Sequence, residues 1–199
     1  MTLETTSFLT ATELDGLGLA SLGKGSKISR RASIYGAARL HIGENVRIDD
    51  FVVISAGEGG IRIGSHVHIA VFGLLMGAAH IELRDFANLS SRVTLYSSSD
   101  DFSGHHMTSP VIPARFTGVT NAPVTIGRHA LLGTGCTLLP GVTIGDGTAV
   151  GAMTLVKNSL EPYGIFAGSP IRRIGDRSRK LLELEAEFIR ERATTAPGA

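Results

Sequence analysis

Aliphatic side chains recur at every sixth position through most of this chain. In the C-terminal half the series runs through Ile126, Leu132, Leu138, Ile144, Val150 and Val156. Earlier series run through Ile42, Ile48 and Ile54, and then through Ile63, Ile69, Leu75, Ile81, Ala87 and Val93. Neither the 3.6-residue period of an α-helix nor the two-residue period of a simple strand produces such a repeat.

Small residues accompany the aliphatic series at fixed places. Gly follows the aliphatic residue at Gly127, Gly133 and Gly145, and a small residue such as Ala130 or Cys136 stands two positions before it. Three short strands of about six residues each, coiled into a triangular prism, would place one aliphatic side chain inside on every side. Glycine would tolerate the bends. The pattern therefore predicts an all-β protein of stacked coils. A β-sandwich is the alternative, but it would not hold this phase through LLGTGCTLLPGVTIGDGTAVGAMTLV.

The segment PVTIGRHALLGTGCTLLPGVTIGDGTAVGAMTLVKNSLEPYGIFAGSPIRRI resembles the C-terminal coils of the hexapeptide-repeat acyltransferases. It is most similar to the galactoside, maltose and xenobiotic acetyltransferases and to the nucleotide-amino-sugar N-acyltransferases of surface-polysaccharide pathways. The resemblance covers the chain from Ile28 to Ile174. It implies a left-handed parallel β-helix, an exception to right-handed crossovers, and a homotrimer with active sites in the clefts between subunits.

The chain divides into three parts on this reading. Residues 1–27 form a lead-in with a short helix near Thr12 to Leu17, and residues 28–174 form the β-helix domain, with a slip at Gly57 to Gly60. Residues 97–123 break the repeat and predict a long excursion loop. Residues 175–199 hold an amphipathic helix and a tail, and the apolar face of this helix needs its own coils or a neighbouring subunit as a partner.

Composition narrows the possible functions. The net charge of +1 argues against a broad nucleic-acid-binding face, and no apolar run is long enough to span a membrane. The start of the chain lacks the features of a signal peptide, so we expect a cytoplasmic protein without membrane or nucleic-acid partners. The single cysteine, Cys136, excludes an internal disulfide and a multi-cysteine zinc site, and its place in the interior row argues against a catalytic thiol.

Acyl transfer from a thioester requires a base for the acceptor proton, donors for the developing oxyanion and a slot for coenzyme A. The resemblance places the family's catalytic histidine at the start of the loop, where this chain has Asp100 in Tyr96-Ser97-Ser98-Ser99-Asp100. The same matching puts His68 where the sugar acetyltransferases have an active-site asparagine. We expect His68 and Asp100 to face each other, as an imidazole base oriented by a carboxylate. The alternative is that His68 is an ordinary surface residue.

The loop offers further candidates for acceptor binding. Asp101, with Asp100, would hydrogen-bond sugar hydroxyls or form a polar turn, and His105 or His106 would contact the acceptor or remain solvated. Absence of the usual histidine also favours an amine acceptor, which needs less help from a base. Asp49 and Asp50 would form a turn or, as the alternative, bind the acceptor. The remaining histidines are expected to be structural or exposed: His41, His66, His80 and His129.

The resemblance also implies residues for coenzyme A. It places Thr134 and Ala152 along the pantetheine arm, with Lys157, Arg172 and Arg173 as cations for the phosphates. Arg172 ends the stretch Ser169-Pro170-Ile171-Arg172, which is similar to the family's Asn-Pro-Ala-Arg signature.

The sequence therefore predicts an acetyl-CoA-dependent acetyltransferase that needs no metal. Its acceptor is a free, glycosidic or nucleotide-linked sugar, acylated on a hydroxyl or an amino group in surface-polysaccharide biosynthesis. Two alternatives share the prism: a zinc carbonic anhydrase of the γ type and a non-catalytic scaffold. The first needs two metal-binding histidines five positions apart, and no two of the seven histidines here have that spacing.

Overall fold

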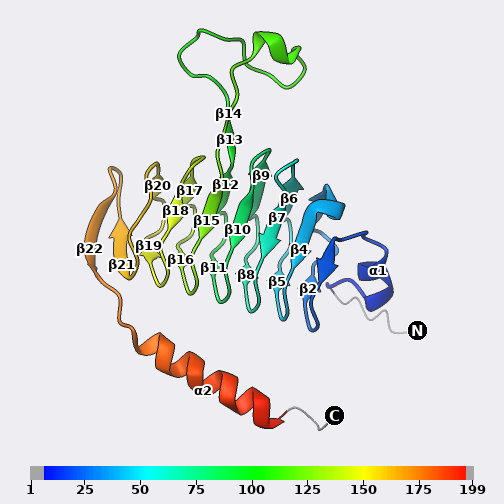
Figure 1. The fold of residues 1–199 in the computed structure, drawn as a ribbon, viewed down its shortest axis with the longest axis vertical. Helices are drawn as coiled ribbons and strands as arrows, with labels where there is room; N and C mark the ends of the chain where they lie inside the picture. The colour runs from blue at the N-terminus through cyan, green and yellow to red at the C-terminus, as the bar shows by residue number, and fades with distance from the viewer. Residues whose placement is uncertain (1–6, 196–199) are drawn as a thin grey trace.

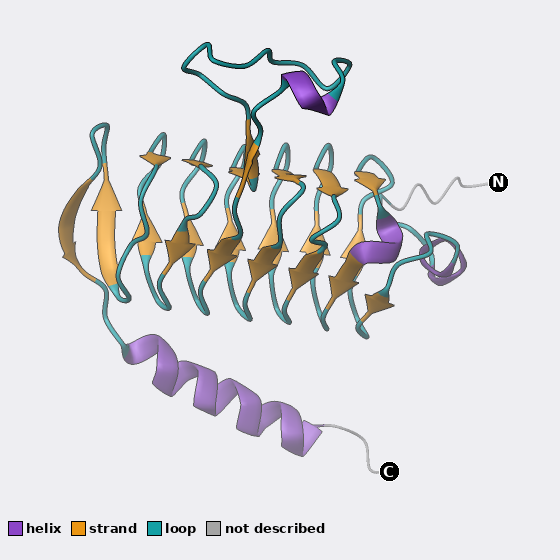
Figure 2. Cartoon of the chain, turned by 45° about the horizontal axis from the view of Figure 1, so that its top comes forward, coloured by secondary structure: helices purple, strands orange, loops and turns teal. Residues whose placement is uncertain are grey.

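The computed structural model describes residues 7–195, and short parallel strands wind through them as a three-sided column of stacked coils (Figures 1 and 2). Sheet 1 contains β1 (Ser21–Leu22), β4 (Leu40–Ile42), β7 (Ile61–Ile63), β10 (Ile81–Leu83), β15 (Val124–Ile126) and β18 (Thr143–Ile144). Sheet 2 contains β2 (Lys27–Ile28), β5 (Arg47–Ile48), β8 (His68–Ile69), β11 (Asn88–Leu89), β16 (Leu131–Leu132), β19 (Ala149–Val150), β21 (Gly164–Ala167) and β22 (Arg172–Asp176). Sheet 3 contains β3 (Ser33–Tyr35), β6 (Val53–Ala56), β9 (Leu74–Gly77), β12 (Thr94–Tyr96), β17 (Thr137–Leu138) and β20 (Leu155–Val156). The predicted all-β coil is confirmed, and its first turn begins at Ser21, before the expected start at residue 28.

The interior consists of aliphatic rows that run the length of the column. One row links Ile42, Ile63, Leu83, Ile126 and Ile144 in register, and all five side chains are buried. The expected series was wrong in one coil, where Leu83 rather than Ile81 continues the row of Ile63. The corner between β9 and β10 is longer than in an ideal repeat, so the six-residue step from Leu75 ends too early.

The same shift affects the next two sides of that coil. Leu89 pairs with Ile69, and Leu95 pairs with Leu75. Ile81, Ala87 and Val93 occupy the neighbouring interior rows instead, and they are fully buried there. The row of Ala87 holds small side chains in the other coils too, such as Val67 and Ala130. This position explains why Ala87 was the exception in the aliphatic series.

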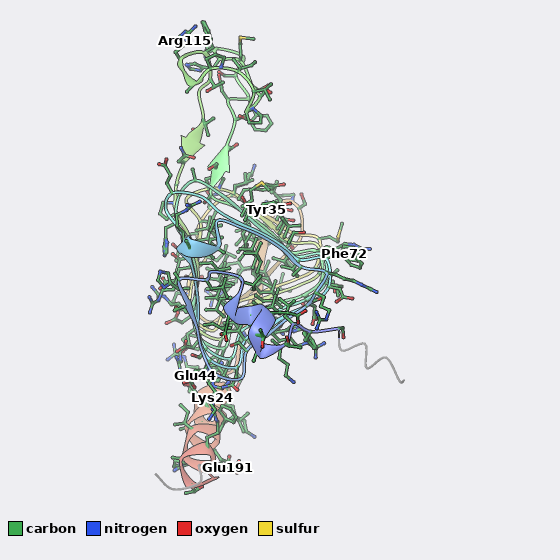
Figure 3. All side chains as sticks on the ribbon, turned by 90° about the vertical axis from the view of Figure 1, so that its right-hand side faces the viewer. Lys24, Tyr35, Glu44, Phe72, Arg115 and Glu191 are labelled. Atoms are coloured by element: carbon green, nitrogen blue, oxygen red, sulfur yellow. The ribbon has the colours of Figure 1, made fainter. Side chains whose placement is uncertain are left out.

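Three corners join the three sheets, and they differ in which element covers them or leaves the column there. We call the corner between sheets 1 and 2 the helix corner, because helix α2 (Lys180–Thr195) packs against it. The corner between sheets 3 and 1 is the loop corner, from which residues 97–123 leave the column (Figure 2). The corner between sheets 2 and 3 is the open corner, because neither of these elements covers it (Figure 3).

The excursion loop stands away from the column on an antiparallel stalk. Strands β13 (Ser98–Ser99) and β14 (Thr120–Asn121) pair with each other, and a 3₁₀ turn, η2 (Ala114–Phe116), lies further out. Another 3₁₀ turn, η1 (Ala37–Arg39), lies at the loop corner of the first coil. The loop exposes large apolar side chains, with Phe102 94% and Val111 87% exposed. Such side chains are suited to contact with another molecule.

Two helices flank the column. Helix α1 (Ala11–Asp15) begins at a capping box between Thr10 and Glu13, close to the expected helix. The predicted C-terminal helix is α2, whose Glu185 contacts Arg128 and lies 2.5 Å from His129. The Phe188 ring meets His66 edge-on at 5.2 Å. No helix in residues 7–195 is long and apolar enough to cross a membrane.

Because the interior is closely packed, truncation of an interior leucine should be costly. We expect Leu132→Ala to lower the free energy of unfolding by about 2–5 kcal/mol, since Leu132 is 0% exposed. The matched control is Leu155→Ala, because Leu155 is 40% exposed and should lose less than about 1 kcal/mol. Urea denaturation measures both values, and equal losses would contradict the assigned interior row.

Candidate active site

Successive coils bring several predicted site residues together at the open corner. The Met153 N–H donates to the Thr134 carbonyl at 2.8 Å, so Thr134 and Ala152 lie in adjacent coils. Both side chains are exposed. The Gly135 N–H donates in the same way to the Ser91 carbonyl at 3.0 Å, which extends the column toward the N-terminal coils. A long, thin molecule lying along this corner would meet Ser91, Thr134 and Ala152 in turn.

The candidate phosphate-binding cations differ in how free they are. Arg173 is held by ion pairs with Glu161 and Asp176, whereas within residues 7–195 the exposed Arg172 guanidinium donates only to the Ile171 carbonyl, at 3.2 Å. Arg172 pairs with Ala167 at the C-terminal end of sheet 2, on the side of the open corner. Lys157 follows β20 and lies at the loop corner instead. Arg172 is therefore the stronger candidate for an anion at this end of the column.

His68 is oriented by a carboxylate, but not by the expected one. Its Nε2 lies 2.8 Å from Oδ2 of Asp49, and the Arg47 Nε donates to the other oxygen at 2.6 Å. Partial burial tends to raise the pKa of Asp49, but the hydrogen bonds from His68 and Arg47 outweigh it and hold this pKa below its usual range. The structure thus holds a histidine–carboxylate pair on sheet 2, beside the open corner.

Asp100 lies on a different part of the coil. It follows β13 at the base of the loop and lines a cavity of about 500 Å³, together with Met76, Tyr96 and Ile112. Sheet 3 separates this loop corner from the open corner near His68. The expectation that His68 and Asp100 of one chain face each other is therefore wrong: the repeat match identified the coil of each residue but not its side.

The other loop residues are engaged with one another. Asp101 accepts hydrogen bonds from the Ser103 N–H at 2.8 Å and from the His106 N–H at 2.9 Å, and its carboxylate lies 3.0 Å from His106 Nδ1. These hydrogen bonds, first those of Ser103, hold the pKa of Asp101 well below its usual range. The exposed His105 contacts Ser103 Oγ at 2.8 Å. Asp101 and His106 thus stabilise the turn, and a role for Asp101, His105 or His106 in acceptor binding stays a prediction.

Thiol and metal chemistry have little support in this site. Cys136 is buried, donates to the Gly151 carbonyl at 3.0 Å, and burial raises the pKa of its thiol. Within residues 7–195, no three His, Cys, Asp or Glu side chains are grouped as metal ligands. The expected interior position of Cys136 is confirmed.

Comparison with known proteins places the chain in a family. It is 44% identical to the dTDP-4-amino-4,6-dideoxy-D-glucose acyltransferase of Escherichia coli over 182 aligned residues. The alignment covers 92% of this chain and 95% of that enzyme. The chain belongs to the hexapeptide-repeat acyltransferases. Residues 123–158 of this acyltransferase also match the model of the bacterial transferase hexapeptide family. The predicted family is confirmed, and acyl-CoA-dependent acyl transfer is favoured over the carbonic anhydrase and scaffold alternatives.

Two further relatives place this acyltransferase within the family. The structure of AntD, an N-acyltransferase from Bacillus cereus in complex with dTDP and 3-hydroxybutyryl-CoA, superposes with a TM-score of 0.91 at 43% identity, over 95% of this chain and all of AntD. The galactoside O-acetyltransferase of Escherichia coli K12 is 28% identical over 77% of this chain and 73% of its own length. The nucleotide-amino-sugar and galactoside branches named by the sequence resemblance are both represented.

Sequence reasoning missed Asp49 as the partner of His68 and Glu185 as the anchor of α2. The sequence did contain a signal for Asp49. Arg47 occupies the position of His68 in the preceding coil, and Asp49 stands two positions after Arg47. The second had no such signal, because Glu185 and Arg128 lie far apart in sequence and meet only after β22 redirects the chain.

The contrast between the two neighbouring arginines of the acyltransferase predicts different roles. Arg172→Ala should raise the KM for acyl-CoA, because a free guanidinium pairs well with phosphate, and leave the KM for the acceptor nearly constant. Arg173→Ala is the matched control, since Arg173 is already paired and should affect the KM for acyl-CoA much less. Steady-state kinetics with each substrate varied measures both, and equal effects would contradict the assignment.

Proposed function

We propose that this acyltransferase acylates the 4-amino group of a dTDP-linked 4-amino-4,6-dideoxy sugar. The observation that carries the proposal is the 44% identity, along nearly the whole chain, with an enzyme named for that substrate. AntD supports it, because variants of that enzyme were solved with dTDP-4-amino-4,6-dideoxyglucose and coenzyme A. More distant relatives carry names from lipopolysaccharide and colanic acid biosynthesis, which supports a role for the product in surface polysaccharide.

The chemistry is a direct acyl transfer. The amine lone pair attacks the thioester carbonyl, the C–N bond forms, and the C–S bond then breaks to release coenzyme A as a thiol. The nitrogen loses one proton during this step; a nearby carboxylate or imidazole accepts it, and the departing sulfur takes up one proton, so that no net proton is released. Asp100 and the His68–Asp49 pair are the groups that we propose for this proton and for orienting the amine.

A spacing in AntD supports a site shared between two copies. Solved variants of that enzyme replace a serine and an aspartate ten positions later. Within the region 90–101 of this chain, the same spacing joins Ser90 to Asp100 and Ser91 to Asp101. Either pair has its serine at the open corner and its aspartate beyond β12, at the loop corner. We take the two replaced residues of AntD to serve one site, and residues at such separate corners of one column would reach one ligand from different subunits.

We therefore propose that the active site lies between copies in a homotrimer. The excursion loop of one copy would cover the open corner of the next, which gives a partner to exposed side chains such as Phe102 and Val111. In this arrangement Asp100 of one copy approaches His68 of another, although the two are separated within one chain.

The acyl group is proposed to be acetyl or a short hydroxyacyl group. AntD was solved with 3-hydroxybutyryl-CoA, so its site accepts a chain longer than acetyl. The cavity beside Asp100 has mostly apolar neighbours, among them Met76, Tyr96 and Val119, and its volume of about 500 Å³ leaves room for several carbons.

Thiol release tests the proposed reaction. With acetyl-CoA or 3-hydroxybutyryl-CoA, the enzyme should release coenzyme A rapidly when dTDP-4-amino-4,6-dideoxyglucose is present. The same nucleotide sugar with a 4-hydroxyl is the matched control, and it should react far more slowly because a hydroxyl is the poorer nucleophile at neutral pH. Equal rates with the two, or activity on free galactosides alone, would contradict the proposal.

Complementation between subunits tests the shared site. Asp100→Asn and His68→Ala should each lower kcat by about 10²–10⁴ when present in every subunit. When the two variants are co-expressed and mixed trimers are purified by separate tags, some clefts combine an intact Asp100 with an intact His68. Activity should then recover to a measurable fraction of the wild-type value, at a mass of three times the 20.9 kDa chain.

The control for complementation is the double variant, in which no cleft can be intact. No recovery in the mixed trimers would show that Asp100 and His68 act within one chain, and it would contradict the shared site. If Asp100→Asn or His68→Ala is active when present in every subunit, that residue has no part in the proposed mechanism.

A further inference from the structure

The column carries two ladders of aromatic side chains, and only one of them is covered. At the helix corner His66, Phe86 and His129 stack with centroids 4.8–4.9 Å apart, and Phe188 of α2 lies edge-on against this ladder. At the open corner Phe51 and Phe72 stack at 5.2 Å, and they are 47% and 50% exposed. Figure 3 shows Phe72 at a corner remote from the loop that carries Arg115 and from the helix that carries Glu191.

The open-corner ladder is held in an unfavourable backbone conformation. Phe51 has φ 60° and Phe72 has φ 61°, values that bulky residues rarely adopt. The same conformation recurs along this corner, where Arg92 has φ 60° and Met153 has φ 56°, so it belongs to the coil rather than to the ladder. What sets Phe51 and Phe72 apart is that two large aromatic rings remain about half exposed, which leaves their edges available to a ligand.

Guanidinium groups close both ends of this ladder. The Arg31 Cζ lies 5.6 Å from the Phe51 centroid, and the Arg92 Cζ lies 5.6 Å from the Phe72 centroid. Arg31 also contacts Asp50 at 3.3 Å, whereas Arg92 forms no ion pair among the residues that the structure describes. An apolar edge beside a free guanidinium has the chemistry to bind a planar base that carries phosphates.

The ladder is continuous with the proposed active site. The Arg92 N–H donates to the Val71 carbonyl at 3.0 Å, and the next coils at the same corner carry Thr134 and Ala152. Along sheet 2 the outward positions are Lys27, Arg47 and His68 in the first coils and Leu131, Ala149 and Ile165 in the last. Because Arg47 and His68 share the Asp49 carboxylate, Arg92 at the corner is the candidate for an anion in the N-terminal half. The uncharged outward positions of β16, β19 and β21 suit the pantetheine arm.

We propose that Phe51 and Phe72 bind the nucleobase of the acceptor and that Arg92 binds its diphosphate, an inference that rests on the proposed function. The ring faces are occupied by each other and by the guanidinium groups, so the thymine lies across their exposed edges. The edges of aromatic rings carry positive charge and attract the π-face of a base. The sugar then extends past Ser91 toward Thr134, where the thioester arrives from the C-terminal half.

Calorimetry of dTDP binding tests this assignment without any turnover. The double variant Phe51→Asn/Phe72→Asn removes both rings, and asparagine tolerates positive φ, so the coil should keep its thermal stability. The Kd for dTDP should rise about tenfold or more, in line with the usual strength of base–aromatic contacts, while the Kd for coenzyme A stays constant. Met153→Asn is the matched control, since Met153 has φ 56° at the same corner and lies beyond the ladder.

Two arms separate the base from the diphosphate. Arg92→Ala should weaken dTDP but leave thymidine binding unchanged, whereas loss of the rings should weaken both. The chain contains no tryptophan, so Phe72→Trp provides a single fluorescent reporter. At a fixed protein concentration at which the trimer is fully assembled, its emission should change saturably with dTDP. Emission that does not respond to dTDP, although calorimetry shows that dTDP binds, would overturn the proposal.

The remaining outcomes distinguish this inference from the function on which it rests. If the wild-type enzyme binds dTDP and the double variant binds it equally well, the ladder is not the nucleotide site, and the proposed acceptor is unaffected. If the wild-type enzyme does not bind dTDP at all, the proposed acceptor and the ladder assignment both fail.

Discussion

The narrow interior of the column constrains every other feature of the molecule. Each side of a coil points residues into neighbouring interior rows, such as Ile61 and Ile63 on sheet 1, and these side chains are buried against the coils above and below. Interiors pack densely and tolerate few changes of volume, so this space admits neither a ligand nor an uncompensated charge. Binding and catalysis are therefore confined to the outward positions and the corners.

The corners are where this fold places different functions, because the chain can leave the repeat there without breaking the strand pairing of the sheets. Helix α2 packs against the helix corner through Glu185, Arg128 and Phe188, and the excursion loop leaves the column at the loop corner. Only the open corner keeps an uninterrupted outward surface along the described column. Because the distance between adjacent coils is fixed by strand pairing, residues one coil apart at this corner form a regular series. Such a series suits an extended cofactor and a nucleotide laid end to end.

Much of the fold follows from the sequence because the repeat is local. The six-residue period fixes which side chains point inward, and residues one full coil apart, such as Thr134 and Ala152, meet as expected. The phase was lost at Ile81 because both this residue and Leu83 are aliphatic, and the variable length of the loop corner decides between them. The repeat alone contains no information on that length.

The site was less predictable, because its partners depend on which side of the triangle each residue occupies. His68 and Asp100 lie near the same level of the column but on different sides, so a match by repeat brought them together wrongly. Asp49 was overlooked because it is 19 residues from His68 in sequence, and the two side chains meet only through the stacking of adjacent coils. Arg172 and Arg173 are adjacent and chemically alike, and only the antiparallel turn of β22 brings Glu161 and Asp176 to one of them.

A carboxylate at the base of the loop and an amine acceptor are two aspects of one adaptation. A hydroxyl is a weak acid, so its proton must leave as the new bond forms, and a base with a pKa near neutrality serves this step best. An amine keeps its proton until the C–N bond has formed, when the nitrogen becomes a cation and a much stronger acid. A carboxylate then suffices to accept the proton, and its negative charge also stabilises the developing cation, which is the role that we propose for Asp100. Aspartate in place of the family's histidine is therefore better suited to forming an amide than an ester.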